Sequence, residues 1–348
     1  MVEPRPGLRD AAPYRVPQQD VPVRLNTNEC PYALPDGFAA ELGEAVRVIP
    51  FHRYPDREAL TLREALVAHT GHPLDGVWAA NGSNEIIEQL LLAYGGPGRR
   101  VVLFEPTYAL HGQIAWTAHS ELVRIELPPG FVIGEREIHA ATESRPSVVF
   151  VCSPNNPTGN AQPREVVEDV VSSTDALVIV DEAYVEFGGK SAADLVVSHP
   201  NLVVVRTFSK AFALAAARIG YCLAAREVIE DLERVRLPYH LSALTQTAGL
   251  VALRYASEAM SILDAVRRER DRLSRRLTDI AGVEAYPSDA NFVLFRPPKP
   301  AAEVWQGLLD HGVLVRDVSA QVPGCLRVTA GTTNEVDAFL TSLEEVLR

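Results

Sequence analysis

Three short apolar runs in the middle of the chain each end in side chains that can do chemistry. The runs at 148–151, 177–180 and 202–205 are rich in β-branched residues, which is typical of strands buried in a parallel sheet. An amide, an acid and an amine follow them in turn: Asn156, Asp181 and Lys210. Ligands of open α/β sheets bind at the carboxyl ends of the strands, so the sequence predicts that these side chains share one site.

A lysine in such a place can react with an aldehyde. Its amine forms a Schiff base once its surroundings lower its pKa. Pyridoxal phosphate is an aldehyde that needs this lysine, a carboxylate on its ring nitrogen and donors for its phosphate. Asp181 is a candidate for the carboxylate, and Ser209 and Arg218 are candidates for the donors. Taken singly, these residues could be a surface lysine, a helix cap and a solvated arginine; their order along the chain favours the pyridoxal site.

The motifs around these residues carry a family resemblance. In the motifs at 153–159, 181–184 and 207–213, the chain resembles the fold-type I aminotransferases, and among them the histidinol-phosphate aminotransferase group. The likeness extends from Tyr14 to Arg327. It implies a pyridoxal-phosphate enzyme that moves an amino group between L-glutamate/2-oxoglutarate and histidinol phosphate/imidazole acetol phosphate, in histidine biosynthesis. It also implies a homodimer whose active sites are shared between subunits.

The resemblance assigns cofactor roles residue by residue. The implied phosphate ligands are Ser83, Asn84, Thr207, Ser209 and Arg218. The cofactor ring would stack on Tyr108. The phenolic oxygen of the cofactor would receive hydrogen bonds from Asn156 and Tyr184. The implied catalytic residues are Lys210, Asp181 and Tyr184. Tyr54 is similar to the residue that reaches the phosphate of the neighbouring subunit. For Ser83, a plain helix cap is the competing interpretation.

Substrate recognition is assigned by the same resemblance. The residues implied around the substrate are Tyr14, Asn156, Tyr239, Arg316 and Arg327. A planar guanidinium suits a carboxylate or a phosphate, although Arg316 could instead pair with the adjacent Asp317. The chain departs from the group's usual pattern at Cys30, Ala33 and Ala216, and Cys30 is expected to be a residue of the site's mouth.

These departures keep other functions open. One alternative is an aminotransferase of aromatic amino acids or of a specialised metabolite. A second is a pyridoxal-dependent decarboxylase of a phosphorylated amino acid, which would share the lysine and the arginines. A non-catalytic binding protein on this scaffold is disfavoured, because Lys210 and Asp181 are both present.

The elements that must position these residues alternate between helix and strand. Helical spacing is found at 55–70, after the turn at 81–84 and from Pro163 onward, which together with the apolar runs predicts βαβ units. The fold class is therefore α/β, with a mostly parallel central sheet flanked by helices and a smaller α+β domain. The predicted division is 48–256 for the large cofactor-binding domain, and 1–47 with 257–348 for the arm and the small domain.

The later part of the chain is expected to build the small domain. A long helix is predicted over 257–280, followed by strands at 291–295 and 326–329. The basic residues at 267–276 are expected to be a solvated face of that helix.

Composition limits the partners of the protein. The chain has 348 residues, enough for about two domains, and its net charge of −12 argues against nucleic acid. Its four cysteines form no CxxC pair, which indicates neither a metal site nor a disulfide framework and favours a reducing, cytoplasmic location. The sequence contains no apolar run long enough for a membrane span and no signal-peptide pattern.

Overall fold

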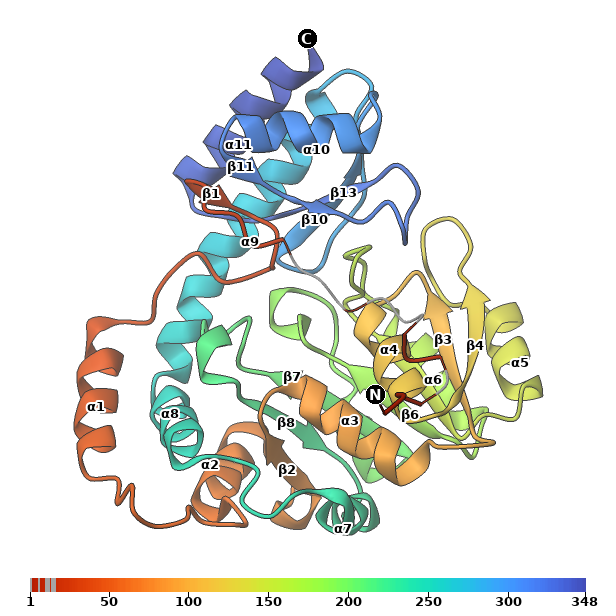
Figure 1. The fold of residues 1–348 in the computed structure, drawn as a ribbon, viewed down its shortest axis with the longest axis vertical. Helices are drawn as coiled ribbons and strands as arrows, with labels where there is room; N and C mark the ends of the chain where they lie inside the picture. Colours follow the sequence, from red (N-terminus) through yellow and green to blue (C-terminus); the bar gives the residue numbers. More distant parts are fainter. Residues whose placement is uncertain (1, 6, 10–12, 14–16) are drawn as a thin grey trace.

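A computed structural model describes residues 2–5, 7–9, 13 and 17–348 of the chain. A large layered part carries the middle of the sequence, and a smaller part above it carries the C-terminus (Figure 1). Tyr14, one of the expected substrate residues, lies outside the described residues.

A seven-stranded sheet forms the centre of the large part. Its strands follow the order β2-β8-β7-β6-β5-β3-β4, and all run parallel except β8, which is antiparallel to both neighbours. The bounds are β2 Val77–Ala80, β3 Arg100–Glu105, β4 Glu121–Glu126, β5 Val148–Cys152, β6 Leu177–Asp181, β7 Leu202–Thr207 and β8 Gly220–Leu223. The three apolar runs are thus the adjacent strands β5, β6 and β7, which confirms the predicted α/β class.

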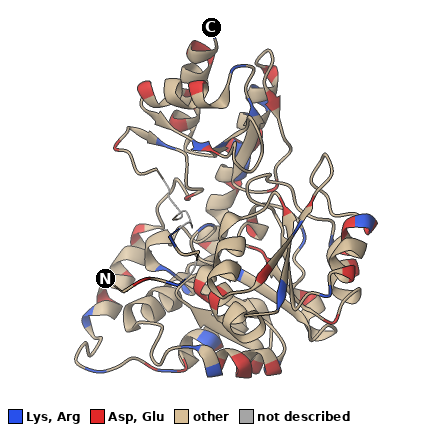
Figure 2. Ribbon diagram, turned by 45° about the vertical axis from the view of Figure 1, so that its right-hand side comes forward, with Lys and Arg blue, Asp and Glu red and all other residues tan. Residues whose placement is uncertain are grey.

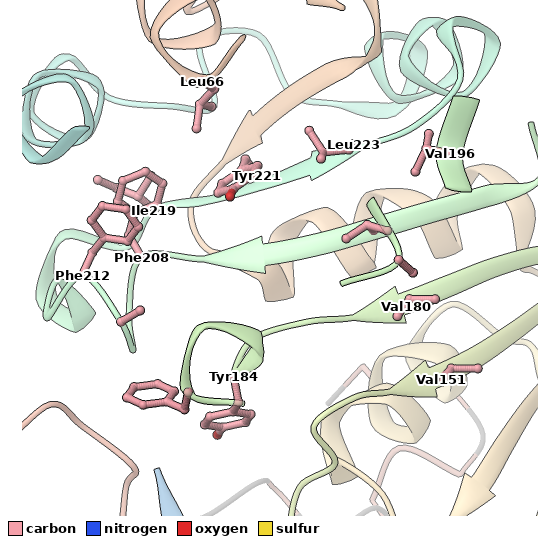
Figure 3. Close-up of a cluster of buried hydrophobic side chains, with 14 of the residues drawn as sticks. Leu66, Val151, Val180, Tyr184, Val196, Phe208, Phe212, Ile219, Tyr221 and Leu223 are labelled. Carbon is pink, nitrogen blue, oxygen red and sulfur yellow. The ribbon is translucent and has the colours of Figure 1, made fainter. Parts of the chain in front are cut away.

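Helices cover both faces of this sheet because its inner strands, such as β5 and β6, carry apolar side chains on both sides. One face packs against α3 (Ser83–Tyr94), α4 (Ala109–Thr117) and α7 (Arg226–Val235). The other packs against α2 (Leu60–Thr70), α5 (Glu135–Glu143), α6 (Arg164–Ser172) and α8 (Ala243–Arg254). Figure 3 shows part of this second cluster, in which Val151 and Val180 lie on neighbouring strands and Tyr184 lies beyond the strand ends.

The smaller part is built on a four-stranded antiparallel sheet of order β12-β13-β10-β9. Its strands are β9 Glu284–Ala285, β10 Phe292–Arg296, β12 Arg316–Asp317 and β13 Leu326–Thr329, and it packs against α10 (Ala301–Asp310) and α11 (Thr333–Leu347). The N-terminal arm joins it through β1 (Val23–Arg24), which pairs in parallel with β11 (Val313–Leu314). Residues at the two ends of the chain therefore form one structural unit.

The long helix α9 (Ala256–Asp279) connects the two parts. Leu263 and Val266 belong to the core of the large part, while Leu273 and Leu277 belong to the core of the small part. The first helix, α1 (Asp36–Arg47), packs on the large part against α8. The domain limits at 48 and 257 stay a prediction.

The basic stretch of α9 differs from the expectation. Arg267 and Arg270 donate hydrogen bonds to backbone carbonyls of the loop after β6, at Glu186 and Phe187, and Arg270 also donates to the carbonyl of Ala290. The expectation of a solvated face was wrong for these two arginines, because local helical spacing does not reveal a loop that approaches the helix. Elsewhere the charged residues are scattered over the fold (Figure 2). None of the helices in the described ranges is long and apolar enough to cross a membrane.

Candidate active site

A cavity of about 220 Å³ opens where the carboxyl ends of β5, β6 and β7 meet the start of α3 and the arm. Its lining includes most of the expected residues: Ser83, Asn84, Tyr108, Asn156, Asp181, Tyr184, Thr207, Ser209, Lys210, Arg218, Arg316 and Arg327. It also includes residues that sequence reasoning did not assign: Asn26, Thr27, Asn28, Cys152 and Ala183. Most of the expected site residues therefore come together, from both parts of the molecule.

Lys210 lies just beyond β7 and points its amine at the arm. Nζ donates a hydrogen bond to the backbone carbonyl of Thr27 at 2.8 Å. Loss of hydration in the cavity lowers the pKa of Lys210 from 10.5 to about 7, and the cations of Arg327 and Arg218 act in the same direction. A large fraction of this amine is therefore neutral near pH 7, which is the form that attacks carbonyl carbon and accepts protons.

Asp181, at the end of β6, is held by two donors. The backbone N–H of Ala183 donates to Oδ1 at 3.0 Å, and Nε2 of His111 lies 2.9 Å from Oδ2. His111 is fully buried and stacks on Phe150 of β5, with ring centroids 4.5 Å apart. The carboxylate oxygen can only accept, so this contact places a proton on Nε2.

Sequence reasoning missed His111. It lies in α4, three residues after Tyr108, so that both side chains fall on one side of the helix start. Their rings meet edge to face with centroids 5.3 Å apart. The spacing from Tyr108 was a usable signal, but nothing in the sequence indicates that this side of α4 faces Asp181.

The start of α3 is suited to an anion. The N-cap of α3 is Gly82, and no side chain caps the helix, so the first backbone N–H groups are available to a ligand. Ser83 is the first helical residue and does not cap, which removes the competing interpretation of this serine. A Cβ at Gly220 would lie 2.4 Å from the backbone nitrogen of Ser83, so glycine is required for β8 to approach the helix this closely.

Hydroxyl groups and a cation complete this anion site. Thr207 Oγ1 donates to Ser209 Oγ at 3.0 Å, and Nη1 of Arg218 donates to the same Ser209 oxygen at 3.1 Å. A Cβ at Gly82 would lie 2.8 Å from Nη2 of Arg218, so the guanidinium fills the space that the glycine leaves. Ser83, Thr207, Ser209 and Arg218 thus form a cradle with the charge and donors that a phosphate requires.

Tyr184, beyond the end of β6, and Arg327, on the small-domain strand β13, also line the cavity. The hydroxyl of Tyr184 accepts a hydrogen bond from Nδ2 of Asn28 at 2.9 Å, and burial raises the pKa of this phenol. Arg327, on β13, donates to Oδ1 of Asn156 and to the carbonyl of Asn26. The arm therefore contributes directly to the site.

Three expected residues lie elsewhere. Cys30 lines a separate hollow of about 210 Å³ with Glu29 and Glu335, so it does not border the main cavity, and the expectation of a mouth residue was wrong for that cavity. Tyr54 and Tyr239 also lie outside the cavity lining. These two tyrosines stack on each other with ring centroids 4.4 Å apart, and Tyr54 is 80% exposed.

A lysine of lowered pKa, a buried carboxylate and a phosphate-type cradle on this fold define the class of fold-type I pyridoxal-phosphate-dependent enzymes. The chain belongs to the aminotransferase class I and II family, whose model matches residues 21–343. The histidinol-phosphate aminotransferase of Frankia casuarinae is 48% identical to it, over 99% of this chain and 90% of the relative. The enzyme of the same name from Rhodococcus opacus is also 48% identical, over 98% of this chain and 92% of the relative.

A solved structure agrees with this membership. Histidinol-phosphate aminotransferase from Sinorhizobium meliloti, in complex with pyridoxal-5'-phosphate, superposes with a TM-score of 0.87 at 25% identity. The match covers 94% of this chain and 91% of that one. The resemblance, the fold class and the pyridoxal cofactor inferred from the sequence are confirmed. The role of each site residue stays a prediction.

Proposed function

We propose that this protein transfers an amino group between L-glutamate and imidazole acetol phosphate, yielding 2-oxoglutarate and histidinol phosphate. The observation that carries the proposal is the joint lining of one cavity by Lys210, whose pKa is lowered to about 7, and by the cations Arg316 and Arg327. Lys210 provides the amine chemistry, and the two arginines provide partners for anionic substrates. The relatives at 48% identity carry the name of this activity.

The cofactor fits the residues of the cavity. Its phosphate would be held by the cradle at the start of α3, its ring nitrogen by Asp181 and its aldehyde by Lys210. When bound, pyridoxal phosphate supplies an electron sink that stabilises negative charge on the substrate's α-carbon. Asp181 would keep the ring nitrogen protonated, and the hydrogen bond with Nε2 of His111 holds the Asp181 side chain in place.

Lys210 is the group that moves the proton. Because about half of its amine is neutral near pH 7, Nζ would take a proton from the substrate's α-carbon and deliver it to the carbon of the cofactor's former aldehyde group, as amino-group transfer requires. The carbonyl of Thr27 accepts a hydrogen bond from Nζ and so orients the amine. General acid–base groups work best when their pKa lies near the working pH, which is the condition met here.

Two arginines supply charge for the substrate. Arg327 is buried and fixed by Asn156 and by the Asn26 carbonyl, so its guanidinium is held in one orientation for the anionic group of the donor, the carboxylate of glutamate or the phosphate of histidinol phosphate. Arg316, on the neighbouring strand β12, lines the same cavity and is the candidate partner of a substrate phosphate. Asn156 would accept a hydrogen bond from Arg327 and donate one to the cofactor.

The proposed assembly is a homodimer. Tyr54 and Tyr239 lie outside the cavity of their own chain and present a stacked aromatic pair to solvent. Other exposed apolar side chains, Val48, Phe51 and Leu237, belong to the same two segments. Such an apolar surface suits a second copy of the chain, whose Tyr54 would then reach the neighbouring site. The cytoplasmic location also stays a prediction, based on four cysteines that are not paired with one another.

A panel of amino donors tests the proposal. The loaded protein is mixed with glutamate, histidinol phosphate, histidinol or phenylalanine, and the visible spectrum and the keto product are recorded. We expect conversion with glutamate and histidinol phosphate and little with histidinol, which lacks only the phosphate. Equal use of phenylalanine would favour an aromatic aminotransferase, and carbon dioxide release without 2-oxoglutarate would favour a decarboxylase.

A further inference from the structure

Asn28 occupies an unusual position between the arm, the small domain and the site. Its backbone is left-handed, with φ of +55°, and its side chain is almost completely buried. Asparagine is one of the few non-glycine residues that adopt this conformation readily. Nδ2 of Asn291 donates to the carbonyl of Asn28 at 3.0 Å, which ties the residue to the start of β10.

The orientation of the Asn28 amide is determined by Thr329 of β13. The backbone N–H of Asn28 donates to Thr329 Oγ1 at 3.1 Å. The single hydroxyl proton of Thr329 is therefore directed away from that N–H group. Oδ1 of Asn28, 3.1 Å from Thr329 Oγ1, accepts it. With Oδ1 held by Thr329, Nδ2 must face the opposite way, toward Tyr184.

The same reasoning gives the direction of the Tyr184 proton. A phenol oxygen accepts along its lone pairs and carries one proton of its own. Because Nδ2 of Asn28 donates to this oxygen at 2.9 Å, the Tyr184 proton is not directed at Asn28. Tyr184 lines the cavity, so the open side of its hydroxyl is the cavity itself.

We infer that Asn28 is a positioning residue that directs the hydroxyl proton of Tyr184 into the cofactor cavity, with Thr329 fixing the orientation of its amide. This inference rests on the proposed function, in which Tyr184 donates to the phenolic oxygen of the cofactor. A proton held there stabilises negative charge on that oxygen, and a donor behind it strengthens the effect. When the negative charge on the phenolic oxygen is less stabilised, the proton that titrates in the cofactor-loaded site is lost only at higher pH.

The first variant pair acts at Asn28. Asn28→Asp keeps the shape and tolerates the left-handed backbone, but its carboxylate accepts the Tyr184 proton and draws it away from the cavity. Asn28→Gly removes the amide without backbone strain. We measure the pH midpoint of the visible absorbance of the cofactor-loaded protein, which needs no turnover. The midpoint is expected to rise by about one pH unit in Asn28→Asp and by less in Asn28→Gly.

The second pair acts at Thr329 and separates positioning from packing. Thr329→Val keeps the volume but removes the hydroxyl that holds the amide, so the midpoint is expected to rise. Thr329→Ser keeps the hydroxyl, and its midpoint is expected to equal that of the unchanged protein. A rise in Thr329→Ser as large as that in Thr329→Val would overturn the role given to Thr329, because removing only the methyl group would then have the same effect as removing the hydroxyl.

A double-mutant cycle gives the decisive result. In a Tyr184→Phe background the hydroxyl is gone, so Asn28→Asp should no longer move the midpoint beyond the small effect of its charge. Additive shifts in the single and double variants would overturn the inference. Unchanged midpoints in all Asn28 variants would overturn it as well. If the unchanged protein, loaded with pyridoxal phosphate, fails to convert with glutamate, the proposed function fails instead, and the two failures are thus distinguishable.

Discussion

Nε2 of His111 lies 2.9 Å from Oδ2 of Asp181, and both side chains are buried between α4 and the end of β6. The face of the imidazole stacks on the ring of Phe150. His111 is not among the residues that line the cavity, but it holds the carboxylate that is proposed to keep the cofactor protonated.

Replacing His111 by phenylalanine should therefore weaken cofactor binding. The variant keeps a ring against Phe150 but removes a hydrogen bond to a charged group, worth about 1.5–3 kcal/mol, so the dissociation constant of pyridoxal phosphate should rise about 10- to 100-fold. Fluorescence titration of the cofactor-free protein measures it. His139→Phe is the control, because His139 is an exposed residue of α5 that pairs only with Glu143 in the described structure. Equal affinities of the His111 variant and the unchanged protein would contradict the role.

Lys210 should make the cofactor-free protein less stable at low pH. Its folded pKa of about 7 lies below the ordinary value of 10.5, so between these values the unfolded chain binds more protons and stability rises with pH. Lys210→Met removes this dependence. The variant should be more stable than the unchanged protein by a few kcal/mol below pH 7, with the difference disappearing toward pH 10.5. Urea unfolding at several pH values measures this, and a difference independent of pH would contradict the lowered pKa.

Replacing the two arginines should affect the two substrates differently. Arg327→Lys loses the planar contacts to Asn156 and Asn26 and should impair all donors, glutamate included, by about two orders of magnitude in kcat/KM. Arg316→Gln should impair histidinol phosphate strongly and glutamate little. Steady-state kinetics with the two donors measures both. The same loss for both donors in the Arg316 variant would argue against its partnership with the phosphate.

Gly220 should tolerate no side chain. A Cβ there meets the backbone nitrogen of Ser83 at 2.4 Å, so Gly220→Ala must displace the start of α3 and should cost about 1–3 kcal/mol of stability as well as phosphate affinity. The matched control is Gly43→Ala in α1, where a Cβ meets nothing within 4 Å and alanine should be neutral or stabilising. Thermal unfolding and cofactor titration measure the pair, and equal behaviour of the two variants would disprove the close approach.

Shared active sites can be tested by mixing two inactive variants. Lys210→Ala and Tyr54→Ala each damage both sites of a proposed homodimer. In a mixed dimer one site receives Lys210 from one subunit and Tyr54 from the other, so random mixing should restore about a quarter of the unchanged activity. Unfolding and refolding the variants together provides the exchange, and sedimentation measures the dimer. If the mixture stays as inactive as its components, Tyr54 does not act across subunits.

Local sequence was sufficient for the elements and for the reactive residues. The runs that became β5, β6 and β7 are short and β-branched, and parallel strands necessarily bring their carboxyl ends to one edge of the sheet. The grouping of Asn156, Asp181 and Lys210 follows from that geometry. The polar, glycine-containing turn that opens α3 likewise indicates an anion site from local sequence alone, because a helix start presents unpaired N–H groups wherever it lies in the fold.

Only the tertiary structure decided the partners of these residues. His111 meets Asp181 from 70 positions away, Thr27 meets Lys210 from 183 and Thr329 meets Asn28 from 301. Hydrophobic periodicity gives the buried face of a helix but not which strand end that face approaches, and it says nothing about where an irregular arm returns. The reactive amine and acid are therefore properties of the sequence, whereas the lowered pKa of Lys210 and the orientation of Tyr184 arise from packing between distant segments.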